Sequence, residues 1–140
     1  MTDKAFRKQK KRVQAILDRW VGPVGFGWNK IDVEWTREAA SEGEGAGVVG
    51  QATVQWQYRQ ALITFNLPVC ARQKDAALEE AVVHELCHIL IGPIQDYSDE
   101  ACRQQTEFTV TCVTSALIWA RKAGRKDNAK PGEVAVAIQA

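Results

Sequence analysis

The chain lacks the features that mark membrane-inserted, secreted or disulfide-stapled proteins. No apolar run approaches the roughly 20 residues that a transmembrane helix needs. The charged start MTDKAFRKQKKRVQ is not followed by the apolar segment of a secretion signal. The four cysteines show no CxxC spacing, so we expect reduced thiols rather than a disulfide framework. These absences predict a cytoplasmic protein with no membrane partner.

A strong excess of one charge is also missing. The formal net charge is +1 over 140 residues, which neither favours nor excludes nucleic acid as a partner. Six basic residues are nevertheless concentrated in KAFRKQKKR, residues 4–12. We interpret them as a solvated helix face, and the alternative is a patch that contacts nucleic acid or a protein partner.

Hydrophobic periodicity predicts three helices and three strands in one domain. The expected helices are residues 4–21, Asp75 to Ile91 with Asp75 as N-cap, and Ser98 to about Ala123 with Ser98 as N-cap. The expected strands are WNKIDVEWT, ATVQWQY and ALITFN, the last two joined by a tight hairpin at Arg59-Gln60. This order is typical of an α+β domain with a small, mostly antiparallel sheet.

The domain is expected to span residues 1–123, with residues 124–140 as a flexible tail. The glycine-rich segment REAASEGEGAGVVGQ is interpreted as a loop between the first two strands, because it has no apolar period. The five tryptophans fall mainly on apolar faces of the expected elements, so we expect them to belong to the core.

The only two histidines of the chain, His84 and His88, flank Glu85 in the run HELCH. On a helix, positions four apart differ by about 40° in direction, so both imidazoles can point at one metal ion. Glu85 is rotated by about 100° from His84, where it can bond a water on that metal instead of joining the ligands. This is the HExxH pattern of metallohydrolases, in which the glutamate is the general base.

A catalytic zinc usually has three protein ligands and one open position. Because no third histidine exists, an arrangement with a further histidine downstream is excluded, and a carboxylate or a cysteine must complete the set. The candidates are Glu107 and Glu100 in the next helix, Asp96 and Asp99 in or beside the link, and Cys102.

The stretches VVHELCHILIGP and QQTEFTVTCVTSAL resemble small gluzincin-type metallopeptidases, especially those encoded by phages and prophages. The layout is similar to SprT-like proteases and ImmA/IrrE-type regulatory proteases, and the resemblance covers residues 52–120 or so. It implies a zincin-like minimal domain in the cytoplasm, that of the host if a phage encodes it. It also implies Zn²⁺ held by His84, His88 and Glu107, with Glu85 as the base.

The resemblance further implies that ALITFN lies beside the cleft and offers a Leu62, Thr64 and Asn66 edge to an extended substrate. The sequence departs from larger gluzincins at Thr111, where those proteins carry an acidic residue that supports a ligand histidine. No histidine is left to stabilise an oxyanion, so Tyr97 or Tyr58 would have to serve.

These patterns predict a zinc-dependent peptidase that acts on a protein or peptide. The alternative is a non-catalytic module that zinc stabilises and that contacts nucleic acid or a protein partner through the basic N-terminal helix. Zinc is expected rather than calcium or magnesium because imidazoles are poor ligands for hard cations.

Overall fold

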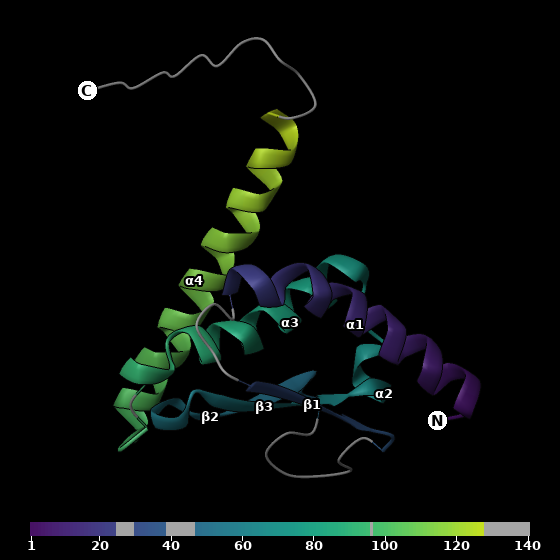
Figure 1. The fold of residues 1–140 in the computed structure, drawn as a ribbon, viewed down its shortest axis with the longest axis horizontal. Helices are drawn as coiled ribbons and strands as arrows, with labels where there is room; N and C mark the ends of the chain where they lie inside the picture. Colours follow the sequence, from purple (N-terminus) through teal and green to yellow (C-terminus); the bar gives the residue numbers. More distant parts are fainter. Residues whose placement is uncertain (25–29, 39–46, 96, 128–140) are drawn as a thin grey trace.

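Helices cover one face of a three-stranded sheet in the computed structural model, which describes residues 1–24, 30–38, 47–95 and 97–127 (Figure 1). The elements are α1 (Asp3–Val24), β1 (Lys30–Thr36), β2 (Gly50–Gln55), the 3-10 turn η1 (Trp56–Tyr58), β3 (Gln60–Asn66), α2 (Leu67–Cys70), α3 (Asp75–Leu90), η2 (Gly92–Ile94) and α4 (Glu100–Asp127). The predicted α+β class is confirmed.

The sheet is mixed, with β3 in the middle of the order β1-β3-β2. β1 pairs with β3 in parallel, from Lys30 opposite Gln60 to Thr36 opposite Asn66. β2 pairs with β3 antiparallel. The prediction of a mostly antiparallel sheet was therefore wrong for one of the two pairings. The inward positions of β3 are the most completely buried of the three strands, in keeping with its central place.

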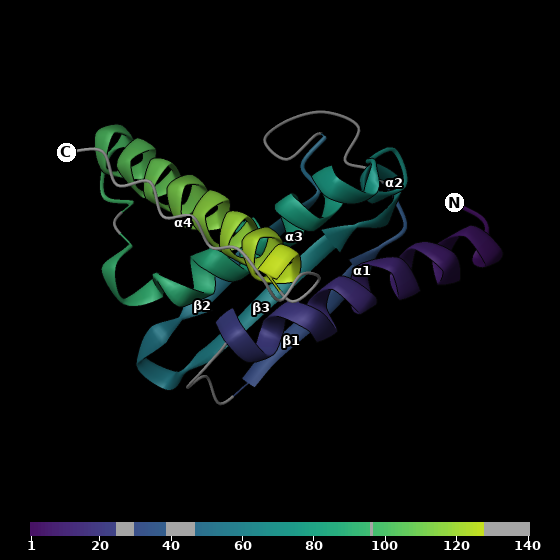
Figure 2. The same cartoon turned by 90° about the horizontal axis from the view of Figure 1, so that it is seen from above.

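The core lies between this sheet and the helices α1 and α3, which lie side by side above it (Figure 2). α1 is amphipathic, and each fully buried apolar side chain of its inner face stabilises the fold by about 1.5–3 kcal/mol. α3 is apolar over most of its circumference because the sheet, α1 and α4 surround it. The most buried residues are Val13, Leu17, Ile63, Phe65, Leu78, Val82, Val83, Leu86 and Ile89.

Several boundaries differ from the predictions. Strand β2 ends at Gln55, so Trp56 and Tyr58 do not continue it and are 48% and 69% exposed. The hairpin is closed by η1 and by Arg59 in the left-handed region at φ 52°, not by a two-residue turn. Trp119 is also exposed, so the expectation of buried tryptophans was wrong for two of the five, and Trp28 lies outside the described residues.

Helix caps differ as well. Lys74, not Asp75, precedes the first turn of α3. Asp99 caps α4 instead of Ser98, since its Oδ1 accepts a hydrogen bond from the backbone N–H of Cys102 at 2.8 Å. β3 ends at Asn66, two residues before Pro68, and Pro68 lies in the first turn of the short helix α2, which was not predicted.

The last helix is longer than predicted and runs to Asp127, beyond the expected start of the tail at residue 124. The remainder of that predicted tail, 128–140, lies outside the described residues, as does most of the glycine-rich segment. None of the described helices is both long and apolar enough to cross a membrane.

Candidate metal centre

Helix α3 carries both histidines and holds them rigidly. Its neighbouring apolar side chains, Val83, Leu86 and Ile89, are completely buried, which fixes the rotation of the helix about its axis. His88 is only 8% exposed and His84 is half-buried, so both rings lie at the rim of the core. The helix therefore presents two imidazoles in one direction with little freedom to turn them away.

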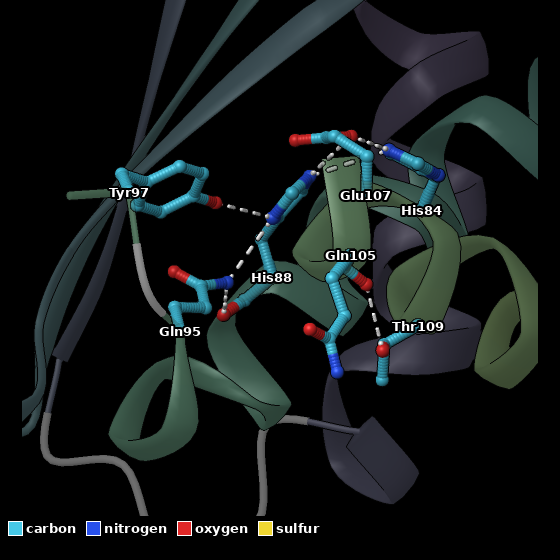
Figure 3. Close-up of polar contacts among 7 residues, drawn as sticks. All are labelled: His84, His88, Gln95, Tyr97, Gln105, Glu107 and Thr109. Atoms are coloured by element: carbon cyan, nitrogen blue, oxygen red, sulfur yellow. Dashed lines mark hydrogen bonds and ion pairs between the residues drawn. The ribbon is translucent and has the colours of Figure 1, made fainter. Parts of the chain in front are cut away.

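Helix α4 brings a carboxylate to the same place. The Oε2 atom of Glu107 lies 3.4 Å from Nε2 of His84 and 3.6 Å from Nε2 of His88. The two histidine Nε2 atoms lie 3.2 Å apart (Figure 3). Buried Val110, one turn after Glu107, contributes to the packing of α4 against the core.

These three ligand atoms fit a tetrahedral cation. Nitrogen and oxygen ligands about 2.0–2.1 Å from a zinc ion, separated by tetrahedral angles, lie about 3.3 Å from one another. The observed separations of 3.2, 3.4 and 3.6 Å bracket that value. The cluster of His84, His88 and Glu107 could therefore hold a metal ion, and it is the one group of this kind among the described residues.

The other residues that the sequence offered as third ligand have other contacts or lie elsewhere. Asp99 caps α4, and Glu100 accepts hydrogen bonds from Arg103 and Gln104 at 2.8 Å. Cys102 lines a separate small cavity. Asp96 lies outside the described residues. Among the described candidates, Glu107 alone reaches the two histidines.

Glu85 lies beside the cluster and is 8% exposed. Burial raises the pKa of its carboxyl to about 7, the backbone N–H of Ala52 lowers it, and the charge of Glu107 raises it further. Glu85 and Phe65 pack closely against Gly50 of β2. A Cβ at position 50 would lie 2.9 Å from the Phe65 ring and 3.2 Å from Cγ of Glu85, so this packing requires glycine.

A cavity of about 1020 Å³ opens beside the cluster. Strand β2 lines it through Gly50, Ala52 and Val54, and the opposite side includes Tyr97 and Arg103. Glu85, His88 and Glu107 all face it. Thr64 and Asn66 of β3 line it as well, so a ligand in this cavity would contact both the metal-binding atoms and the sheet.

Two of the three residues of the predicted substrate edge on β3, Thr64 and Asn66, line this cavity, but the backbone of β3 is not free to pair with a peptide. β3 is the middle strand, so its backbone groups already bond β1 on one side and β2 on the other. Asn66 in addition caps α2 through its side chain. In the part of the chain that the structure describes, β2 has no strand on its outer side, and four of its residues line the cavity: Gly50, Gln51, Ala52 and Val54.

Support for His88 comes from residues that follow α3. Tyr97 Oη lies 3.2 Å and Gln95 Nε2 lies 3.1 Å from His88 Nδ1 (Figure 3). Thr111 is exposed on α4 and supplies no carboxylate. Of the two tyrosines considered for an oxyanion, Tyr97 lines the cavity, whereas Tyr58 lies on the exposed hairpin turn.

Burial raises the pKa of Tyr97 first, and the charges of Glu107 and Glu85 raise it further. The Tyr97 hydroxyl therefore keeps its proton at neutral pH. Gln95, Gly50 and Ala52 were not singled out from the sequence. Only Gly50 carried a signal, as the last glycine before the alternating segment ATVQWQY.

Part of the basic N-terminal segment has partners within the chain. Arg12 donates hydrogen bonds to the carbonyl oxygens of Cys70 and Gln73 and pairs with Asp75 at 2.6 Å. The ammonium group of Lys10 lies 5.3 Å from the centre of the Trp35 ring. These two residues therefore have contacts within the chain, and contact of the segment with nucleic acid stays a prediction.

The chain matches no family model, no curated protein and no solved structure.

Proposed function

We propose that the protein is a zinc-dependent metallopeptidase of the gluzincin type. The observation that carries the proposal is the convergence of His84, His88 and Glu107 on one point, with Glu85 beside them in an open cavity. Two imidazoles and one carboxylate are a ligand set of catalytic zinc sites, which keep a fourth position open.

The zinc would be held by Nε2 of His84, Nε2 of His88 and Oε2 of Glu107. When bound, the ion supplies Lewis acidity, which polarises the scissile carbonyl and lowers the pKa of a water ligand toward about 7. A cation fits the site electrostatically, because Glu85 and Glu107 bring two carboxylates into a partly buried place.

Glu85 is the proposed general base. Glu85 does not belong to the cluster of possible metal ligands, but it lines the same cavity. The backbone N–H of Ala52 orients this carboxyl from the sheet side. In the proposed reaction, Glu85 takes the proton of the attacking water and then gives it to the nitrogen of the leaving amine. The Tyr97 hydroxyl, which lines the cavity, is placed to donate to the developing oxyanion.

Strand β2 is the proposed docking strand for the substrate. An extended peptide that adds to the outer side of β2 would form main-chain hydrogen bonds with it, which gives affinity without demanding one sequence. Ala52 and Val54 of this strand line the cavity, so such a peptide would pass the metal ligands. A folded protein would have to expose a flexible segment to be cleaved.

The test is hydrolysis of a mixed library of unstructured peptides by the zinc-loaded protein and by Glu85→Gln. The variant keeps all three proposed ligands, so we expect it to retain zinc and to lose about 10²–10⁴-fold in rate. Glu80→Gln is the matched control on the same helix and should cleave like the wild type. Equal cleavage by Glu85→Gln would rule out the proposed role of this residue.

The same experiment separates the peptidase from the zinc-stabilised binding module. Zinc retention without any hydrolysis by the wild type would favour the module. DNA retention that falls steeply with salt would then point to the basic segment.

A further inference from the structure

The ring of His88 has different neighbours at its two nitrogen atoms. Nε2 faces Glu107 and His84, whereas Nδ1 faces Tyr97 and Gln95 (Figure 3). A neutral imidazole that binds a metal through Nε2 must carry its proton on Nδ1. The bound state therefore needs a hydrogen-bond acceptor next to Nδ1.

Gln95 cannot be that acceptor in its present position. Its Nε2 atom lies 2.6 Å from the backbone carbonyl oxygen of His88, and this contact requires an N–H donor. The same Nε2 lies 3.1 Å from Nδ1. Exchanging the amide oxygen and nitrogen would place two oxygen acceptors 2.6 Å apart, so the amide nitrogen stays on this side.

The Tyr97 hydroxyl can accept as well as donate. Its oxygen lies 3.2 Å from Nδ1, within hydrogen-bond reach, and it is the remaining neighbour of Nδ1 among the described contacts. We propose that Tyr97 is a positioning residue that accepts a hydrogen bond from Nδ1–H of His88 and so holds this histidine in its metal-binding tautomer. The inference depends on the metal site of the proposed function.

The proposal has a consequence for the metal-free protein. Without a cation, the bare Nδ1 can accept from both the Tyr97 hydroxyl and the Gln95 amide, which leaves the proton on Nε2 beside Glu107. Metal binding then moves the ring proton to Nδ1 and reverses the hydrogen bond with Tyr97. The hydroxyl hydrogen of Tyr97 is thereby freed to point away from His88.

Zinc affinity, measured by competition with a chromophoric chelator, tests the proposal in the full chain. We expect Tyr97→Phe to bind zinc about 10–100-fold more weakly than the wild type, the usual effect of losing a group that supports a ligand histidine. Tyr58→Phe changes the only other tyrosine, which lies on the exposed hairpin turn, and should bind like the wild type. Thermal melts of the metal-free variants check that Tyr97→Phe is folded.

Nitrogen-15 NMR of the two histidines gives a readout that a merely structural role would not move. In the zinc-loaded wild type we expect His88 Nδ1 to carry a proton that exchanges slowly, and in Tyr97→Phe this proton should exchange faster. If the wild type binds zinc and Tyr97→Phe binds it equally well, or if His88 Nδ1 carries no proton, the role of Tyr97 is overturned while the metal site stands. If the wild type binds no zinc, both proposals fail.

Discussion

Oε2 of Glu107 lies 3.4 Å from Nε2 of His84, so a carboxylate from α4 meets an imidazole from α3. This contact has no local origin, since the link after α3 and the start of α4 separate the two residues. Removing the carboxylate should leave two ligands, which is one fewer than a catalytic zinc site uses.

We therefore expect Glu107→Ala to lower zinc affinity by more than about 100-fold, which exceeds the usual loss for a supporting residue. Glu100→Ala is the matched control, because Glu100 lines the same cavity but bonds Arg103 and Gln104. The two affinities are compared by chelator competition. An unchanged affinity in Glu107→Ala would return Asp96, Asp99 and Glu100 to consideration as ligands.

Alanine at Gly50 and at Gly124 should change the free energy of unfolding with opposite signs. A Cβ at Gly50 would lie 2.9 Å from the buried Phe65 ring, so we expect Gly50→Ala to lower the free energy of unfolding by about 1–3 kcal/mol. A Cβ at Gly124, within α4, meets nothing within 4 Å outside its own helix backbone. Gly124→Ala should therefore raise the free energy of unfolding by up to about 1 kcal/mol, because alanine favours helix. Urea unfolding measures both, and equal effects would contradict the described packing.

Arg12 joins α1 to the segment that precedes α3. Its guanidinium donates to the carbonyl oxygens of Cys70 and Gln73, whereas its partner Asp75 is largely exposed. We expect Arg12→Met to lower the free energy of unfolding by about 1–3 kcal/mol, mainly through the two carbonyl bonds, since exposed ion pairs contribute little. Lys11→Met, an exposed neighbour in the same helix, serves as the control in urea unfolding. Equal stability of the two variants would show that Arg12 is a surface charge only.

The Cys70 thiol should make the protein less stable in alkali. Burial raises the pKa of Cys70 from 9.0 to about 11 in the folded protein. Between these values the unfolded chain loses the proton and the folded protein keeps it, so this contribution is complete below about pH 9 and is lost as the pH rises. We expect a loss of about 2 kcal/mol by pH 11.

Urea unfolding at pH 8.5 and 10.5 measures this loss in the wild type and in Cys70→Ala. The variant lacks the thiol, so its stability should fall less over the same interval. Parallel losses in the two proteins would assign the effect to other groups.

The local parts of the site could be predicted from the sequence. The spacing of His84 and His88 on a helix is set within one turn, and the apolar residues around them define which face is buried. The start of α4 was located to within one residue: Ser98 was expected as the cap and Asp99 is the cap, because both are good N-cap residues and lie side by side.

The nonlocal parts could not be predicted. Glu107 reaches the histidines because of how α4 crosses α3. Its distance from His88 along the chain did not show this, so several carboxylates stayed candidates for the third metal ligand. The order of the strands is a tertiary feature without a local sequence signal, so β3 was expected to pair with a substrate although it is the middle strand, and β2 was not recognised as the edge. Gln95 lies in a short link, where a single polar residue gives no periodic signal.

Elemental analysis of the purified protein tests the central claim most directly. After incubation with zinc and removal of the excess, the wild type should contain about one zinc per chain, and His84→Ala should contain almost none. Glu85→Gln should retain as much zinc as the wild type, since Glu85 is not one of the proposed ligands. A wild type that binds no zinc, or a His84→Ala variant that binds as much as the wild type, would contradict the metal centre.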